Sequence, residues 1–247
     1  MATETTTPSP EAKTDKTRKR VTVLFSGRGS NMASLIQASM AADYPAIVTK
    51  AITNVPGAGG LEIAKFHEIS TAEIDHKNFD SREEHEAAMI AEIKKSKPDI
   101  ICLAGYMRIL SEGFVRQFRG KILNIHPSLL PAFKGVDTHH RARVEGVKIH
   151  GATVHFVDET LDGGPIIAQA AVPVRRNDDD DSLTKRVLEA EHQLYPHALA
   201  LVASGEIRLS GSRIALNTST SKDVGAILFS PAIEAGKLEK RSSSDSV

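Results

Sequence analysis

The sequence predicts an α/β fold: a doubly wound, Rossmann-like, mostly parallel sheet with a mixed second half, in a single domain. Two observations lead to this prediction. Short apolar, often β-branched runs alternate with helical segments through the first 125 residues, which is typical of βαβ units. After residue 149, two strand-like runs are separated only by the short turn 158–164, so they can pair as an antiparallel hairpin.

The elements follow from local patterns in chain order. In the first half we expect strands and helices to alternate as strand 20–25, helix 32–42, strand 46–53, helix 61–68, strand 71–74, helix 81–97, strand 99–103, helix 111–118 and strand 121–125. The second half predicts strands 149–157 and 165–174, and then a long helix that ends near Ser204 and is bent or interrupted at Pro196. A small hairpin is expected within residues 206–216.

One domain is expected over residues 20–217, because no linker-like composition interrupts them. Residues 1–19 are rich in Thr, Lys and Pro and are interpreted as a disordered N-terminal tail. Residues 218–247 form a C-terminal extension whose charged, Ser-rich end predicts partial disorder. The tail carries no apolar segment of the kind found in secretory signals, which favours a cytoplasmic protein.

Composition excludes several classes of function. Lys plus Arg and Asp plus Glu both number 31, and this balance argues against a nucleic-acid partner. No stretch approaches the roughly 20 apolar residues of a membrane helix. The single cysteine, Cys102, rules out an intrachain disulfide and suits a reducing compartment. His139 and His140 have no third ligand at convincing spacing, so no metal site is predicted.

The loop after the first strand is a candidate anion site. Gly29 allows a tight turn, and Ser30 and Asn31 lie at the start of the next helix, where free N–H groups attract anions. The loop matches neither GxGxxG nor a Walker pattern, so a phosphate monoester fits better than a dinucleotide. An ordinary Gly-rich β-α turn remains the alternative interpretation.

Three polar residues further along the chain are catalytic candidates. Asn124 and His126 are two residues apart at the end of a strand, so they point to one face at the carboxyl edge, where open α/β sheets bind ligands. Asp162 precedes two glycines in a turn that can project its carboxylate. A hydrogen-bonding strand end and a solvated turn aspartate are the alternatives, and sequence spacing does not show whether Asp162 meets His126.

Taken together, these segments resemble the phosphoribosylglycinamide formyltransferase family of folate-dependent formyltransferases. The matching stretches run in the family's order over residues 20–217, and they are residues 27–31, 80–82, 103–110, 124–131, 150–157, 161–164 and 191–192. Two positions depart from the family pattern. Arg28 stands where some members have Asn, and the segment 133–135 reads Phe-Lys-Gly where many members have an aromatic residue, Pro and Gly.

The resemblance implies formyl transfer from 10-formyltetrahydrofolate, as co-substrate, to the amine of glycinamide ribonucleotide. Asn124 and His126 would hold an oxyanion, and Asp162 would orient His126 and move protons. Gly29, Ser30 and Asn31 would cradle the phosphate, and Glu191 would meet the ribose. The implied folate-binding residues are Arg82, Met107, Arg108, Ile109, Leu110, Val157 and Asp158.

The sequence is also compatible with other functions. A methionyl-tRNA formyltransferase or a formyltetrahydrofolate deformylase would share the Asn, His and Asp set, and an inactive nucleotide-binding module is an alternative of a different class. The Gly27–Asn31 loop favours a small phosphorylated acceptor. Expected partners are therefore the two small substrates, together with a homodimer or a complex of purine-pathway enzymes; the sequence does not choose between these two assemblies.

Overall fold

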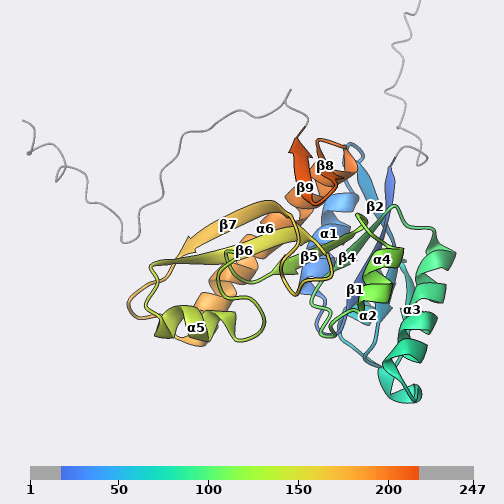
Figure 1. Ribbon diagram of the computed structural model, residues 1–247, viewed down its shortest axis with the longest axis horizontal. Helices are drawn as coiled ribbons and strands as arrows, with labels where there is room; N and C mark the ends of the chain where they lie inside the picture. The colour runs from blue at the N-terminus through green and yellow to red at the C-terminus, as the bar shows by residue number, and fades with distance from the viewer. Residues whose placement is uncertain (1–17, 217–247) are drawn as a thin grey trace, which may run out of the picture. The chain divides into compact units, whose positions relative to one another are not determined.

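The computed structural model describes residues 18–216. They divide into two compact units, one made of residues up to 107 together with 199–204, and the other of 108–198 together with residues from 205 onward. The expectations for the N-terminal tail and the C-terminal extension concern residues that lie almost entirely outside the described range. Figure 1 labels the helices and strands of both units.

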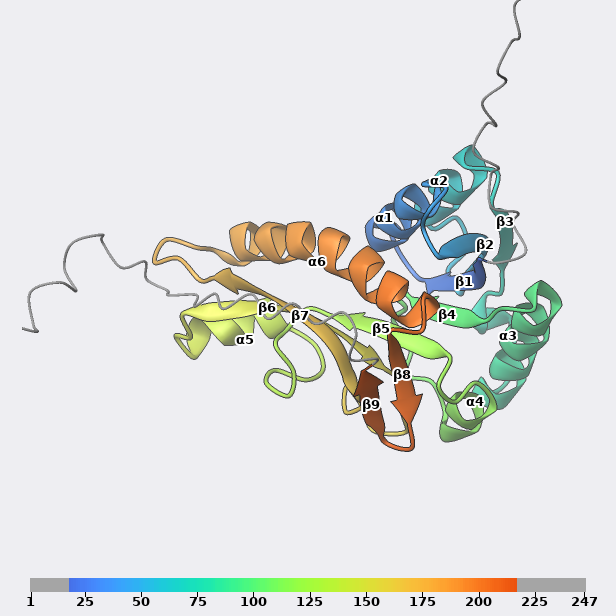
Figure 2. The same cartoon turned by 90° about the horizontal axis from the view of Figure 1, so that it is seen from above.

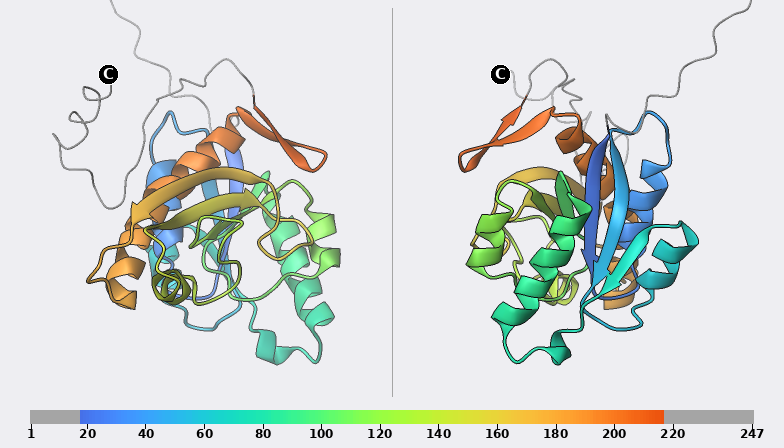
Figure 3. Two further views of the ribbon diagram at one scale, coloured as in Figure 1. Left: turned by 60° about the vertical axis from the view of Figure 1, so that its left-hand side comes forward. Right: turned by 90° about the vertical axis from the view of Figure 1, so that its right-hand side faces the viewer.

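The first unit contains four parallel strands in the order β3-β2-β1-β4. Their bounds are β1 Lys19–Phe25, β2 Ala46–Thr53, β3 Ser70–Glu73 and β4 Ile100–Leu103. Helices α1 (Ser30–Ser39) and α2 (Gly60–Phe66) lie on one side of these strands, and α3 (Arg82–Ser96) lies on the other (Figures 2 and 3). A short 3-10 helix, η2 (His76–Asn78), precedes α3.

Burial explains why β1 and β4 have nearly continuous apolar sequences. The last five residues of β1 and all four of β4 are buried, because helices cover both faces of the strands. The largest fully buried side chains of this unit include Phe25, Met32, Leu35, Ile52 and Met89. The ends of β1 and β2 are therefore held on a rigid support, and the candidate anion loop starts from one of them.

The second unit is built on three antiparallel strands in the order β5-β6-β7. Their bounds are β5 Ile122–His126, β6 Ile149–Phe156 and β7 Ile166–Pro173. Figure 2 shows α6 (Asp180–Ala203) along one side of β6 and β7, with α5 (Thr138–Val144) on the other. Helix α4 (Glu112–Gln117) and the hairpin of β8 (Ile207–Ser210) and β9 (Arg213–Leu216) complete the elements.

The antiparallel hairpin expected after residue 149 is confirmed, since β6 pairs with β7 in this way. Helix α6, in contrast, runs through Pro196 without interruption. Leu194, Tyr195 and Ala198 around the proline are buried, and their packing outweighs the backbone hydrogen bond that a proline removes. Helix α5 was not expected from the sequence, because it buries only Thr138 and Ala142 and therefore has no apolar stripe.

Candidate active site

The end of β5 and the facing part of β6 bring four polar side chains together. Asn124 lies opposite His155 in the antiparallel ladder, and His126 lies opposite Thr153. Alternate residues of a strand share a face, and directly opposed residues of an antiparallel pair have neighbouring side chains. The sheet therefore gathers these four residues on one face, as the sequence predicted for Asn124 and His126.

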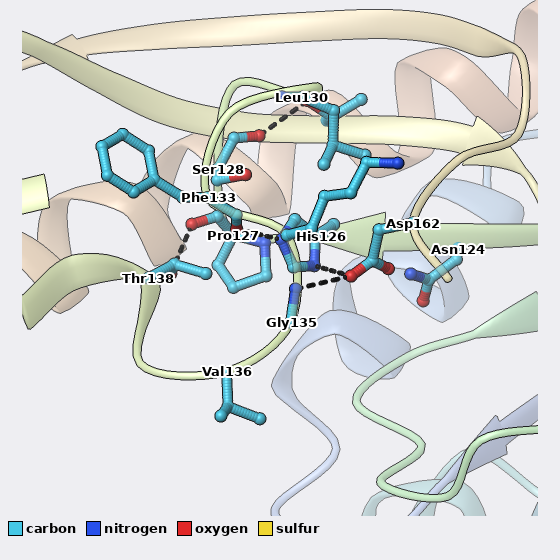
Figure 4. Close-up of polar contacts among 12 residues, drawn as sticks. Asn124, His126, Pro127, Ser128, Leu130, Phe133, Gly135, Val136, Thr138 and Asp162 are labelled. Atoms are coloured by element: carbon cyan, nitrogen blue, oxygen red, sulfur yellow. Dashed lines mark hydrogen bonds and ion pairs between the residues drawn. The ribbon is translucent and has the colours of Figure 1, made fainter. Parts of the chain in front are cut away.

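The His126 ring is held from two sides. The side chain is buried, its Nε2 lies 2.9 Å from the backbone oxygen of Phe133, and its Nδ1 lies 3.5 Å from Oδ2 of Asp162 (Figure 4). A carbonyl oxygen only accepts, so Nε2 carries a hydrogen and donates it. In its charged form, the ring has a donor for each of the two oxygens that it faces.

Asp162 reaches His126 because of the turn that carries it. Asp162 adopts φ 47°. A Cβ on the following Gly163 would lie 2.6 Å from the Thr160 side chain. A Cβ on Gly164 would lie 1.9 Å from the Phe156 oxygen. Both glycines are thus needed for close packing. The Asp162 side chain is only 9% exposed, and its Oδ2 accepts a 2.9 Å hydrogen bond from the amide of Gly135. The structure therefore brings together all three predicted catalytic residues: Asn124, His126 and Asp162.

Asn124 is oriented by a residue that the sequence analysis did not assign to the site. Its amide nitrogen lies 3.2 Å from Nε2 of His155, and Nδ1 of His155 donates to the Phe156 oxygen at 2.9 Å. His155 is buried, and burial lowers the pKa of its imidazole from its usual value. The neutral ring then offers Nε2 as an acceptor for the Asn124 amide.

A buried hydrogen-bond network fixes the segment after His126. The hydroxyl of Thr153 donates to the Ser128 oxygen at 2.6 Å and accepts from the Leu130 amide at 3.0 Å. Gln169 on β7 donates to both Thr153 and the Leu130 oxygen at 2.9 Å. This network fixes the segment that precedes Phe133, whose backbone oxygen accepts the hydrogen bond from His126.

The loop between β1 and α1 has the geometry of an anion site. Gly29 is the N-cap of α1 in the left-handed region, at φ 77°, with no side-chain cap and no acidic residue in the first turn. A Cβ there would lie 2.7 Å from the Cα of Gly60. Ser30 and Asn31 are the first two helical residues, so their backbone N–H groups lie at the positive end of the helix dipole.

A second network supports the strand ends of the first unit. Ser26, just after β1, donates from its hydroxyl to Asn54 Oδ1 at 2.6 Å and accepts from the Met107 amide at 2.9 Å. The carbonyl of Asn54 accepts from His76 at 3.1 Å. These bonds fix the start of the segment 107–110.

The other predicted binding residues occupy varied surroundings. Met107 is 74% exposed and Ile109 is 67% exposed, whereas Arg108 and Leu110 are half-buried. Val157 and Asp158 are half-buried, and the Asp158 carboxylate accepts from the Thr160 amide at 2.8 Å.

Two charged candidates lie on helices. Arg82 opens α3 and pairs with Glu86 one turn later, at 3.2 Å between Nε and Oε1. Glu191 lies on α6 and is buried, unlike the surface residue that its helix position alone would indicate. A buried carboxylate needs polar partners, so this burial favours a specific role for Glu191.

His155, Thr153 and Gln169 were missed as site residues. A signal for the first two was present, since 149–157 alternates and His155 and Thr153 share one face. Their partners were not visible, because pairing with β5 depends on a register that the sequence does not give. Within residues 18–216, the structure contains no cluster of three or more metal-ligating side chains and no helix long and apolar enough to span a membrane.

Comparison with known proteins identifies the family. The model of the formyl transferase family matches residues 19–199, a range that runs through both units. The chain belongs to the formyl transferase family. It is 43% identical to phosphoribosylglycinamide formyltransferase of Escherichia coli over 189 residues, covering 76% of this chain and 89% of the relative.

A solved structure and a longer relative extend the comparison. The crystal structure of phosphoribosylglycinamide formyltransferase from Brucella melitensis is 50% identical, with a TM-score of 0.73, over 78% of this formyl transferase and 100% of that chain. The trifunctional purine biosynthetic protein adenosine-3 of Drosophila melanogaster is 48% identical over 78% of this chain. The matched region spans only 14% of that relative. These matches confirm the predicted α/β fold class.

Proposed function

We propose that this formyl transferase moves the formyl group of 10-formyltetrahydrofolate to the amine of glycinamide ribonucleotide, a step of de novo purine biosynthesis. The observation that carries this proposal is the arrangement of Asn124, His126 and Asp162 in the second unit, where Asn124 and His126 share one face of β5 and His126 faces Asp162. It places an amide, an imidazole and a carboxylate together, which suits acyl transfer to an amine.

The proposed step forms one bond and breaks another. The substrate amine attacks the formyl carbon, and the formyl oxygen becomes an oxyanion. Asn124 donates a hydrogen bond to this oxygen, and His126 in its charged form, with its two N–H groups facing Phe133 and Asp162, stabilises the negative charge. Asp162 holds His126 and takes part in moving the amine proton to N10 of the folate. The carbon–N10 bond then breaks, so the products are the formylated ribonucleotide and tetrahydrofolate.

Binding of the ribonucleotide is assigned to backbone groups and one carboxylate. The N–H groups of residues 29–31 would hold the phosphate, which is supported by the uncapped, positively polarised start of α1. Glu191 would accept hydrogen bonds from the ribose hydroxyls.

Binding of the folate is assigned to the segments 107–110 and 157–158 and to Arg82. The exposed apolar side chains of Met107 and Ile109 would contact the pterin ring, for which a flat apolar surface is suitable. Arg82 and Arg108 would lie near the carboxylated tail. A cytoplasmic location and assembly as a homodimer or with purine-pathway enzymes stay predictions.

An acceptor competition tests the proposed function. The purified protein is supplied with 10-formyltetrahydrofolate and with glycinamide ribonucleotide, methionyl-tRNA or water as the acceptor. We expect rapid transfer to the ribonucleotide and little to the other two. Preferred transfer to methionyl-tRNA, or release of formate at the same rate without the ribonucleotide, would replace the proposal with one of the two related activities.

A further inference from the structure

The side-chain amide of Asn124 can adopt two orientations, and its own shape does not favour one of them. An asparagine amide is nearly symmetric in shape, so its nitrogen and oxygen can exchange places at little steric cost. Only the nitrogen can donate to an oxyanion. A neighbouring group must therefore select the orientation in which the donor is correctly placed.

His155 supplies that selection through a chain of two hydrogen bonds. Its Nδ1 lies 2.9 Å from the Phe156 oxygen, which can only accept, so the hydrogen of the neutral ring is on Nδ1. Its Nε2 is then an acceptor and lies 3.2 Å from Nδ2 of Asn124. If the amide were turned, its oxygen would face this lone pair, and two acceptors would meet without a hydrogen between them.

The position of His155 keeps this arrangement rigid. The side chain is only 3% exposed, and its ring lies directly across the ladder from Asn124. Its Nε2 is 3.9 Å from Oδ1 of Asp162, which is beyond hydrogen-bonding distance. The ring therefore turns its acceptor to Asn124 and makes no hydrogen bond with the carboxylate that faces His126.

We propose that His155 is a positioning residue that fixes the orientation of the Asn124 amide for oxyanion binding. His155 does not touch the substrate in this role. It acts on turnover through Asn124, and the inference rests on the proposed formyl transfer.

Two substitutions of His155 test the role of its acceptor nitrogen, Nε2, separately from the role of the rest of the side chain. His155→Gln keeps an oxygen near the position of Nε2, whereas His155→Asn keeps only polar atoms near the position of Nδ1. We expect His155→Asn to lower kcat about tenfold, with little change in KM for either substrate, because a small misplacement of a catalytic group is costly. His155→Gln should recover most of this loss.

A double-mutant cycle with Asn124→Ala is the decisive measurement. Without the amide there is nothing to orient, so His155→Asn should change kcat less than twofold in that background. The proposal is overturned if His155→Asn lowers kcat equally in both backgrounds, if it has no effect on the wild-type protein, or if His155→Gln is as impaired as His155→Asn. A wild-type protein with no formyl transfer to the ribonucleotide would instead reject the proposed function.

Two further measurements guard against a purely structural effect. His85→Asn replaces another buried histidine, on α3, and should lower the melting temperature without lowering the kcat of the folded protein. Nitrogen NMR of the wild-type protein should show His155 protonated at Nδ1 only. A hydrogen on Nε2 at neutral pH would remove the proposed acceptor and overturn the inference, whether or not the variants fold.

Discussion

The β1–α1 loop and the facing ends of β5 and β6 are assigned to one reaction, but they use different parts of the chain. The loop presents backbone N–H groups, and its main requirement is that Gly29 has no Cβ. The β5–β6 face would work through side chains, each oriented by another polar group. Substitutions should therefore act on substrate affinity in the first region and on turnover in the second.

The largest effect is expected for Asp162→Asn. An amide nearly matches the carboxylate in shape and can still accept the hydrogen bond from the Gly135 amide, so the turn should survive. It carries no charge to face His126 and cannot take a proton. Turnover should fall about 10³-fold while the Kd of both substrates changes little, because the loss falls on the transition state. Rapid-quench assays and calorimetry measure the two quantities, and an equal loss in both would place Asp162 in binding rather than in chemistry.

Asn124→Ala should have the next largest effect. Removing one donor to an oxyanion costs about 10²-fold in kcat. The melting temperature should change only slightly, because Asn124 is half-buried and its partner His155 keeps its bond to the Phe156 oxygen. Wild-type turnover in this variant would remove Asn124 from the proposed mechanism and would leave His155 without a role.

These two regions also differ in how far the sequence could predict them. Gly29, Ser30 and Asn31 are consecutive and follow an apolar strand, so local pattern alone places them at a helix start. The contact between His126 and Asp162 joins residues far apart in the chain, and it depends on the path of the segment after His126 and on the turn at Gly163 and Gly164. No local pattern carries that information, and only the family resemblance pointed to the contact.

The elements of the fold divide in the same way. Runs with strong periodicity or continuous apolar character, such as β1 and the β6–β7 hairpin, were predicted close to their observed bounds. Helix α5 was missed because it is short and buries few residues. The sequence predicted either a bend or an interruption at Pro196, and α6 is not interrupted there because tertiary packing, which a local rule does not include, decides its continuity.

A smaller effect is expected from a negative charge at the candidate anion site. Ser30→Asp places a carboxylate where the phosphate would bind, and it also stabilises the start of α1 through the helix dipole. KM for glycinamide ribonucleotide should rise about tenfold, with the KM for folate unchanged and the melting temperature slightly raised. Ser30→Asn is the neutral control. A similar rise in both variants would indicate that the Ser30 hydroxyl, rather than the backbone, binds the substrate.

The smallest expected effect is a pH dependence of stability, and it arises from histidines of the second unit. Burial lowers the pKa of His139, His150, His155 and His192, all of which lie in the second unit. The largest of these shifts is that of His150, which is 1% exposed; its pKa falls to about 4 because of burial and then because of nearby His139. Between about pH 6.5 and 4, the unfolded chain therefore binds a proton that the folded chain excludes.

Stability contributed by neutral His150 is thus present above pH 6.5 and is lost as the pH falls toward 4. His150→Gln has no such titration, so any difference in melting temperature that favours the wild type at pH 7.5 should shrink by about 2–5 °C at pH 5. Calorimetric scans of both proteins at the two pH values measure the change. A constant difference would show that His150 titrates alike in the folded and unfolded chains. Any pH dependence of stability in the second unit would then come from its other buried histidines. The titrating side chains that distinguish this unit from the β1–α1 loop would no longer include His150.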